Sequence, residues 1–203
     1  MELTRNDIKQ IALDMASEVE MILKASQEAD VTLEQLFEIE RRINQYHKDI
    51  DDKVFKYIAL MNPHAKDLRM ALAVMKMNSE LERIGDQAVN IKRYLRKIKS
   101  ERPGLKSLYD NVMNNYTSCL KAFKEKDTHL ATEVIKFDEH INEINKENIQ
   151  EIVSHANELP FEEAMAIMRI SKNLERIGDH ITNIAEDIIF LESGDDIRHN
   201  PDN

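Results

Sequence analysis

Hydrophobic positions recur along the chain at intervals of three and four residues, the spacing of one face of an α-helix. The two clearest series are Leu81, Ile84, Ala88, Ile91, Leu95, Ile98 and Leu174, Ile177, Ile181, Ile184, Ile188, Leu191. Each series predicts one apolar stripe along a long helix. Such stripes are typical of helices that pack against each other in an antiparallel bundle.

Capping and helix-breaking residues divide the chain into six expected helices. Thr4 and Thr32 are each followed, three residues later, by a side chain that completes a capping box. Asn62 is expected to cap the third helix, with Pro63 in its first turn. Gly194 is expected to end the last helix. The expected helices span residues 4–28, 32–61, 62–99, 105–126, 128–157 and 160–193.

The two halves of the chain repeat each other. Residues 71–91 align with residues 164–184 without a gap, and 11 of the 21 positions are identical. Both segments contain the motif LERIGDxxxNI. Upstream, residues 40–44 match residues 138–142, and the spacing to the motif is five residues shorter in the second half. A repeat of this length indicates a duplicated structural unit.

The sequence therefore predicts an all-α fold of two tandem antiparallel three-helix bundles. The first unit is expected at residues 1–99 and the second at 105–194, with a linker at 100–104 and a polar tail at 195–203. Aromatic residues make up 5% of the chain, which has four Gly and four Pro. That supply of turn-forming residues is too small for a β-sandwich or barrel.

Charge and cysteine content exclude several classes of function. The net charge of −10 argues against a nucleic-acid binder, which needs a basic surface. Cys119 is the one cysteine, so neither a disulfide framework nor a CxxC metal site is expected. No apolar run approaches the ~20 residues of a membrane span, and the first residues lack the apolar region of a signal peptide. We expect a cytoplasmic protein without direct membrane insertion.

Each copy of the motif carries two acids and a glycine on one helix. Glu82 and Asp86, like Glu175 and Asp179, are four residues apart and so lie on one helical face. Acids at this spacing repel by about 0.2–0.5 kcal/mol. The glycine between them costs about 1 kcal/mol relative to alanine. Helix stability alone does not explain this combination, which indicates a function.

A bound cation would offset the repulsion, and the oxygen-only ligands favour Mg²⁺, Mn²⁺, Ca²⁺ or iron. The candidate ligands are Glu82, Asp86, Glu175 and Asp179, with Glu40 and Asp138 on the preceding helices and Asn90 and Asn183 one turn further along. Alternatively, Arg83 pairs with Glu80 or Asp86 and Arg176 pairs with Asp179, in a surface ion-pair network that needs no metal. Both interpretations stay open at this point.

The duplicated ERIGDxxxNI motif, on the third helix of each unit, resembles the PhoU family of phosphate-signalling proteins. The resemblance implies a cytoplasmic, often homodimeric regulator that acts with the ATPase of the phosphate ABC transporter and with a sensor histidine kinase. It implies metal binding at Glu82, Asp86, Glu175 and Asp179. Asn44 and Asn142 stand where the family commonly has a second aspartate, which weakens the expected metal site.

The resemblance implies regulation rather than catalysis, so we do not expect an enzyme. The sequence shows no Gly-rich phosphate loop and no nucleophile–His–acid arrangement. Two alternatives remain. One is a metal-free structural adaptor with acidic docking faces, and the other is a metal-dependent hydrolase, for which no general base can be named.

Overall fold

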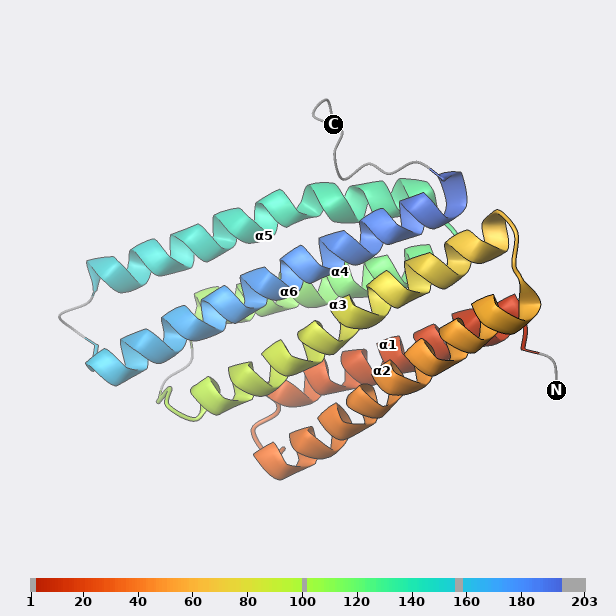
Figure 1. Ribbon diagram of the computed structural model, residues 1–203. Coiled ribbons are helices and arrows are strands. Elements are labelled where there is room, and N and C mark those ends of the chain that lie inside the picture. Colours follow the sequence, from red (N-terminus) through yellow and green to blue (C-terminus); the bar gives the residue numbers. More distant parts are fainter. Residues whose placement is uncertain (1–2, 100–101, 156–158, 195–203) are drawn as a thin grey trace.

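The computed structural model describes residues 3–99, 102–155 and 159–194. Its six helices are α1 (Arg5–Gln27), α2 (Leu33–Met61), α3 (Lys66–Leu95), α4 (Pro103–Glu125), α5 (Thr128–Ser154) and α6 (Phe161–Ser193). Successive helices run in opposite directions (Figure 1). The prediction of an all-α, six-helix fold is confirmed.

Two three-helix units lie side by side. Helices α1, α2 and α3 pack on one another, as do α4, α5 and α6. The most extensive contact of all joins α3 to α6, which run antiparallel through the middle of the molecule, and α1 and α4 also touch (Figure 1). The helices that carry the repeated motif therefore form the seam between the units.

The predicted apolar stripes form this seam and the core behind it. The stripe residues that are buried are Leu81, Ile84, Ala88, Ile91, Leu174, Ile177, Ile181, Ile184, Ile188 and Leu191. Leu95 and Ile98 are partly buried against the same core. Cys119 is also buried, and its thiol lies 3.7 Å from the Ile181 carbonyl oxygen. The hydrophobic periodicity therefore predicted the core-facing side of both motif helices.

The expected helix caps are present at three positions. Thr4 and Asp7 form a capping box at α1, with hydrogen bonds of 3.3 and 2.8 Å between side chain and backbone. Thr32 and Gln35 do the same at α2, at 3.3 and 2.8 Å. Gly194 ends α6 with a φ of 88°, a conformation that favours glycine.

The expected start of the third helix is wrong. Asn62 does not cap α3; it ends α2 in the left-handed conformation, with a φ of 44°. Pro63 disfavours the helical conformation at the residue before it, and asparagine tolerates the left-handed one. Ala65 also has a positive φ, of 41°, and α3 begins only at Lys66. The connection is thus a longer turn than the sequence suggested.

Two other helix ends differ from the prediction. Helix α3 ends at Leu95 rather than Lys99, and α4 begins at Pro103, inside the segment expected to be linker. Proline is well suited to a first helical turn, because its missing N–H has no partner there. Helix α5 ends at Ser154, and the expected end near Asn157 lies outside the described residues, as does the tail at 195–203.

Two tyrosines of α4 tie the second unit to the first. The Tyr116 hydroxyl is fully buried and donates to the Ala16 carbonyl oxygen of α1 at 2.7 Å. The Tyr109 hydroxyl donates to the Leu23 carbonyl oxygen at 3.1 Å. Both bonds join α4 of the second unit to α1 of the first.

Replacing Tyr116 with phenylalanine is expected to lower the free energy of unfolding by about 1 kcal/mol. The substitution keeps the ring and removes only the hydrogen bond to Ala16. Urea denaturation of wild type and variant measures the difference. The same substitution at Tyr46, which lies partly exposed on α2, is the control and should change stability little.

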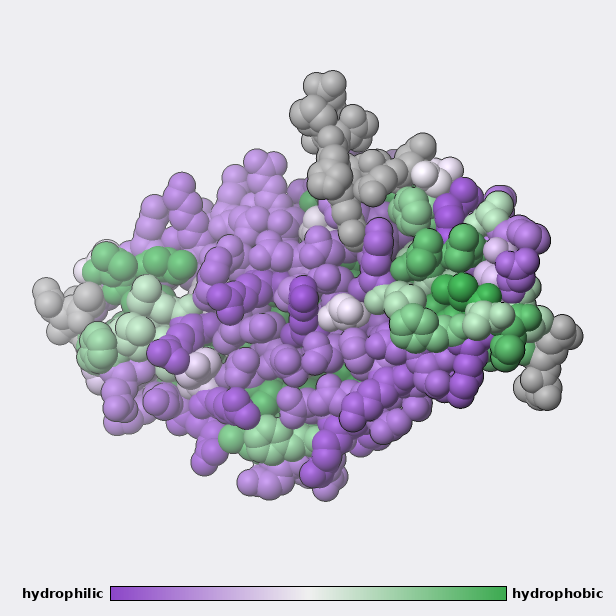
Figure 2. Space-filling view, in the orientation of Figure 1, coloured by the Kyte–Doolittle hydropathy of each residue, from purple (hydrophilic) through white to green (hydrophobic). Residues whose placement is uncertain are grey.

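The visible surface is mainly polar, and apolar side chains gather at both ends of the molecule, where α3 begins and α6 ends and where α6 begins (Figure 1 and Figure 2). Leu68 and Leu72, in the first turns of α3, are 36% and 41% exposed. Across the described ranges, every helix is too polar or too short in its apolar part to cross a membrane.

Candidate functional site

The acids of the first unit meet between α2 and α3. Glu40 and Asp86 lie close enough for their carboxyl groups to share a hydrogen bond. Burial, the charge of Asp86 and this hydrogen bond raise the pKa of Glu40. Burial and the charge of Asp86 also raise the pKa of Glu82, one turn away on α3. The cluster therefore favours uptake of a proton or a cation.

The acids of the second unit meet between α5 and α6. Burial raises the pKa of Asp138 to about 6, and the charges of Asp179 and Glu175 act in the same direction. The Asn142 amide donates to Asp138 Oδ2 at 2.9 Å and opposes this shift. Burial, then the charge of Glu175, raise the pKa of Asp179.

The other carboxylate oxygen of Asp138 has no hydrogen-bond partner, in the part of the chain that the structure describes, to offset its burial. Asp138 Oδ1 is buried and has no hydrogen-bond partner among the described residues. Buried polar atoms in folded proteins almost always have a partner. A bound proton or a cation would satisfy this oxygen.

The six carboxylates form two clusters of three, and neither cluster has the geometry of a metal site. Within residues 3–99, 102–155 and 159–194, no three His, Cys, Asp or Glu side chains stand close enough to hold one metal ion. The two expected amide ligands have other partners: Asn90 accepts from Arg93 at 3.2 Å, and Asn183 donates to Glu80 at 3.0 Å. Metal binding therefore requires rotation of side chains.

Sequence reasoning missed two residues that face the motif glutamates. Asn145 of α5 donates to Glu175 at 3.2 Å and accepts from the Ser171 hydroxyl at 2.6 Å. His47 of α2 lies near Glu82 and lowers the pKa of that carboxyl, against burial and Asp86. In the alignment of residues 40–44 with 138–142, His47 and Asn145 occupy matching positions. The repeat was thus the signal that would have revealed them.

A polar contact between the units lies beside both motifs. His180 Nδ1 and Glu80 Oε2 are 2.7 Å apart, and their side chains are only 15% and 14% exposed. Burial alone would raise the pKa of Glu80, but hydrogen bonds from His180 and Asn183 lower it. The repeat places Gln87 and Asn173 at the matching positions. The α3–α6 contact therefore has an acid and a histidine at one pair of positions and two neutral amides at the pair related to it by the repeat.

The two motif glycines allow close packing within each unit. Gly85 lets α2 approach α3, and Gly178 lets α5 approach α6. A Cβ built on Gly85 would lie 3.1 Å from the Ile43 side chain. A Cβ built on Gly178 would lie 2.8 Å from Asp138 Oδ1 and 3.4 Å from Ile141. The second glycine thus brings the α6 backbone against the unsatisfied carboxylate oxygen.

Gly178→Ala is expected to be less stable than Gly85→Ala by about 1 kcal/mol. Both changes gain about 1 kcal/mol of helix propensity. At Gly85 the Ile43 methyl can yield by a small rotation, whereas at Gly178 the buried Asp138 carboxylate must move. Chemical denaturation of both variants measures the difference. Equal stabilities would show that Asp138 moves aside freely.

Comparison with known proteins gives consistent matches. The chain matches the PhoU domain family twice, over residues 6–95 and 105–188. It is 34% identical over 181 residues to the phosphate-specific transport system accessory protein PhoU homolog of Pseudomonas putida, covering 85% of this chain and 71% of that protein. It is 28% identical over 207 residues to PhoU homolog 1 of Thermotoga maritima, covering 98% and 89%. The crystal structure of PhoU from Pseudomonas aeruginosa superposes with a TM-score of 0.87 at 29% identity, covering 94% and 97%.

Proposed function

The chain belongs to the PhoU family, and we propose that it is an accessory protein that regulates phosphate uptake through a phosphate ABC transporter. The observation that carries this proposal is the double family match, which covers both three-helix units. The relatives that cover most of the chain are named accessory proteins of the phosphate-specific transport system. The proposed partner is the transporter ATPase, and the proposed setting is the cytoplasm.

We further propose that the acidic clusters bind a divalent metal or iron. The bound ion would change the charge of the surface that these clusters present to a partner. Glu40, Glu82 and Asp86 would hold an ion in the first unit, and Asp138, Glu175 and Asp179 in the second. Support comes from the raised pKa values of Glu40, Glu82, Asp138 and Asp179 and from the unsatisfied Asp138 Oδ1. A bound cation would neutralise the repelling carboxylates. The neutralised cluster would then attract basic groups of a partner less strongly than the free acids do.

A sensor histidine kinase as second partner, and a homodimer as the active form, are the finer parts of the proposal. Both rest on the family resemblance. They imply that one chain transmits the state of the transporter to a kinase without catalysing a reaction itself.

The alternative is a metal-free adaptor whose acidic faces bind basic partner surfaces. Ion pairs already engage part of the motif: Arg83 pairs with Glu80 at 3.6 Å, and Lys172 pairs with Glu175. Elemental analysis of protein purified without chelator separates the two readings. Stoichiometric manganese, magnesium or iron supports the metal site, and protein without bound metal supports the alternative.

Deletion of the gene in its host tests the proposed regulation directly. We expect faster uptake of labelled phosphate, and expression of phosphate-starvation genes in phosphate-rich medium. A plasmid copy of the wild-type gene should restore both. Unchanged phosphate uptake and unchanged starvation-gene expression would reject the proposal for this chain.

A further inference from the structure

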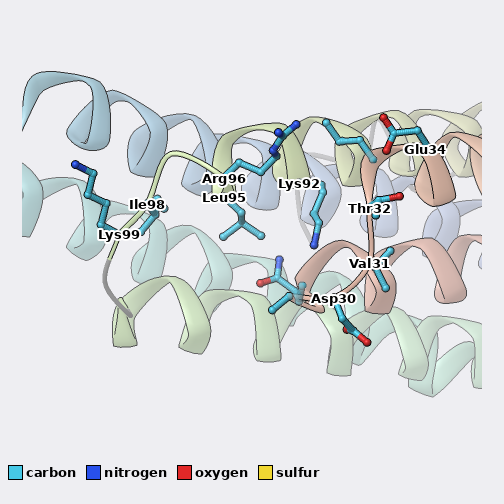
Figure 3. Close-up of a pocket in the computed structure, with 12 residues that line it drawn as sticks. Asp30, Val31, Thr32, Glu34, Lys92, Leu95, Arg96, Ile98 and Lys99 are labelled. Atoms are coloured by element: carbon cyan, nitrogen blue, oxygen red, sulfur yellow. The ribbon is translucent and has the colours of Figure 1, made fainter.

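A groove of about 730 Å³ opens where the α1–α2 connection passes the end of α3. None of the six carboxylates of the acidic clusters lines it, and its walls are mixed. Gln27, Thr32, Lys92, Arg96 and Lys99 contribute polar side chains, and Val31, Leu95 and Ile98 contribute apolar ones. Figure 3 shows the Lys92 amine in the space between α3 and the connection.

The groove is a departure from the internal repeat. The α1–α2 connection has five residues, 28–32, whereas α4 and α5 are joined by residues 126 and 127 alone. The three cations of the groove have no counterpart in the second unit, where the aligned positions are Ala185, Ile189 and Glu192. The duplicated fold therefore does not require this groove or its charges.

Two hydrogen-bond donors converge in the groove with unused capacity. Lys92 is 7% exposed, and its amine donates to the Glu28 carbonyl oxygen. An ammonium group has three N–H donors, so one contact leaves capacity for an anion. Burial lowers the pKa of Lys92, although Asp30 and Glu28 oppose that shift. Gln27 Nε2 is buried and has no hydrogen-bond partner among the described residues.

The rest of the lining also favours an anion. Arg96 and Lys99 are exposed at the rim, and the N-terminus of α2 lies in the wall, where the helix dipole favours negative charge. Asp30 and Glu34 belong to the lining too, but the Asp30 carboxylate points away from the Lys92 amine (Figure 3). Val31, Leu95 and Ile98 are partly buried and leave apolar surface beside these donors.

We propose that this groove binds an organic phosphate monoester. The phosphoryl group would lie against Lys92 and Gln27, and the organic part against Val31, Leu95 and Ile98. A phosphoryl group has three terminal oxygens, so it can accept from Lys92 and Gln27 together and still face the rim cations, whereas a planar carboxylate has two. The volume of about 730 Å³ exceeds what inorganic phosphate alone would fill. The inference rests on the groove and not on the proposed regulation of uptake.

Titration of isotopically labelled protein with phenyl phosphate, followed by amide NMR in the presence of EDTA, tests the proposal. The chelator prevents any phosphate from bridging through a metal at the acidic clusters. We expect shifted amides in residues 28–34 and 92–99, and weaker binding of orthophosphate and benzoate than of phenyl phosphate. Lys92→Met should weaken phenyl phosphate binding by about tenfold, the loss of one charged hydrogen bond.

Two further variants keep the test decisive if Lys92→Met folds poorly. Arg96→Gln removes an exposed rim charge and should weaken binding by about threefold. Lys121→Met, an exposed lysine on α4, is the matched control and should bind as wild type does. Orthophosphate binding as tightly as phenyl phosphate would reduce the site to one for the free ion and overturn the monoester proposal. No binding at millimolar concentrations, or amide shifts confined to other regions, would overturn it entirely.

Discussion

Asp138→Asn is expected to raise the free energy of unfolding at pH 7 by about 2 kcal/mol. In the folded protein the pKa of this carboxyl is raised from 3.8 to about 6. A shift of this size corresponds to about 3 kcal/mol, reduced here because the side chain keeps some contact with water. Asparagine is neutral at every pH, so the variant avoids the cost of a buried charge.

The sign of the pH dependence follows from the raised pKa. The folded state holds the Asp138 proton between about pH 4 and 6, where the unfolded state has lost it, so wild-type stability falls as pH rises through this window. Glu40, Glu82 and Asp179, whose pKa values are also raised, add to the same trend. Asp138→Asn should therefore match wild type near pH 4 and exceed it at pH 7.

Urea denaturation between pH 4 and 7.5, with EDTA present, measures this difference. Glu143→Gln, an exposed acid on the same helix, is the control and should change stability little at either pH. A gain for Asp138→Asn that is the same at pH 4 and pH 7 would contradict the assigned ionisation. The variant is also expected to lose metal affinity, so it separates stability from ligation.

Changing Asp86 and Asp179 together to asparagine is expected to abolish stabilisation by divalent metal. In the wild type, metal at 100 times its dissociation constant should raise the free energy of unfolding by about 3 kcal/mol. Each substitution removes one carboxylate of the motif pair and leaves Glu82 or Glu175 as the remaining acid of its motif. Thermal unfolding at increasing Mn²⁺ and Mg²⁺ concentrations measures the response.

A charge-matched double variant distinguishes ligation from general electrostatics. Glu38→Gln with Glu147→Gln removes two exposed acids from α2 and α5 and should respond to metal as wild type does. If the Asp86 and Asp179 variant responds equally to wild type, these residues are not ligands. If wild type itself shows no response, the metal-free adaptor is the better description.

Patterns of residues three or four positions apart predicted the fold well, because such residues determine where a helix begins and which of its faces is apolar. The stripe from Leu174 to Leu191 gave the buried face of α6, and the capping boxes at Thr4 and Thr32 gave two helix starts. The turn at Asn62 differs from the prediction because asparagine both caps helices and adopts the left-handed conformation that ends them. Only the backbone could decide between these two roles.

The acid pairs of the motif were predictable, but their surroundings were not. The spacing of Glu82 and Asp86 placed both on one face, and the repeat pointed to Glu40 and Asp138. The contact between Glu80 and His180 joins residues 100 positions apart, and no local period encodes such a pair. The groove at Lys92 likewise depends on how the α1–α2 connection passes α3.

The two acidic clusters have diverged since the duplication that made them. The second holds the short Asp138, partly buried against Gly178, whereas the first holds the longer Glu40 beside Asp86. Two unequal sites on one chain would load one after the other as an ion becomes more abundant. Such a protein would report concentration over a wider range than a single site spans, giving graded occupancy rather than one threshold.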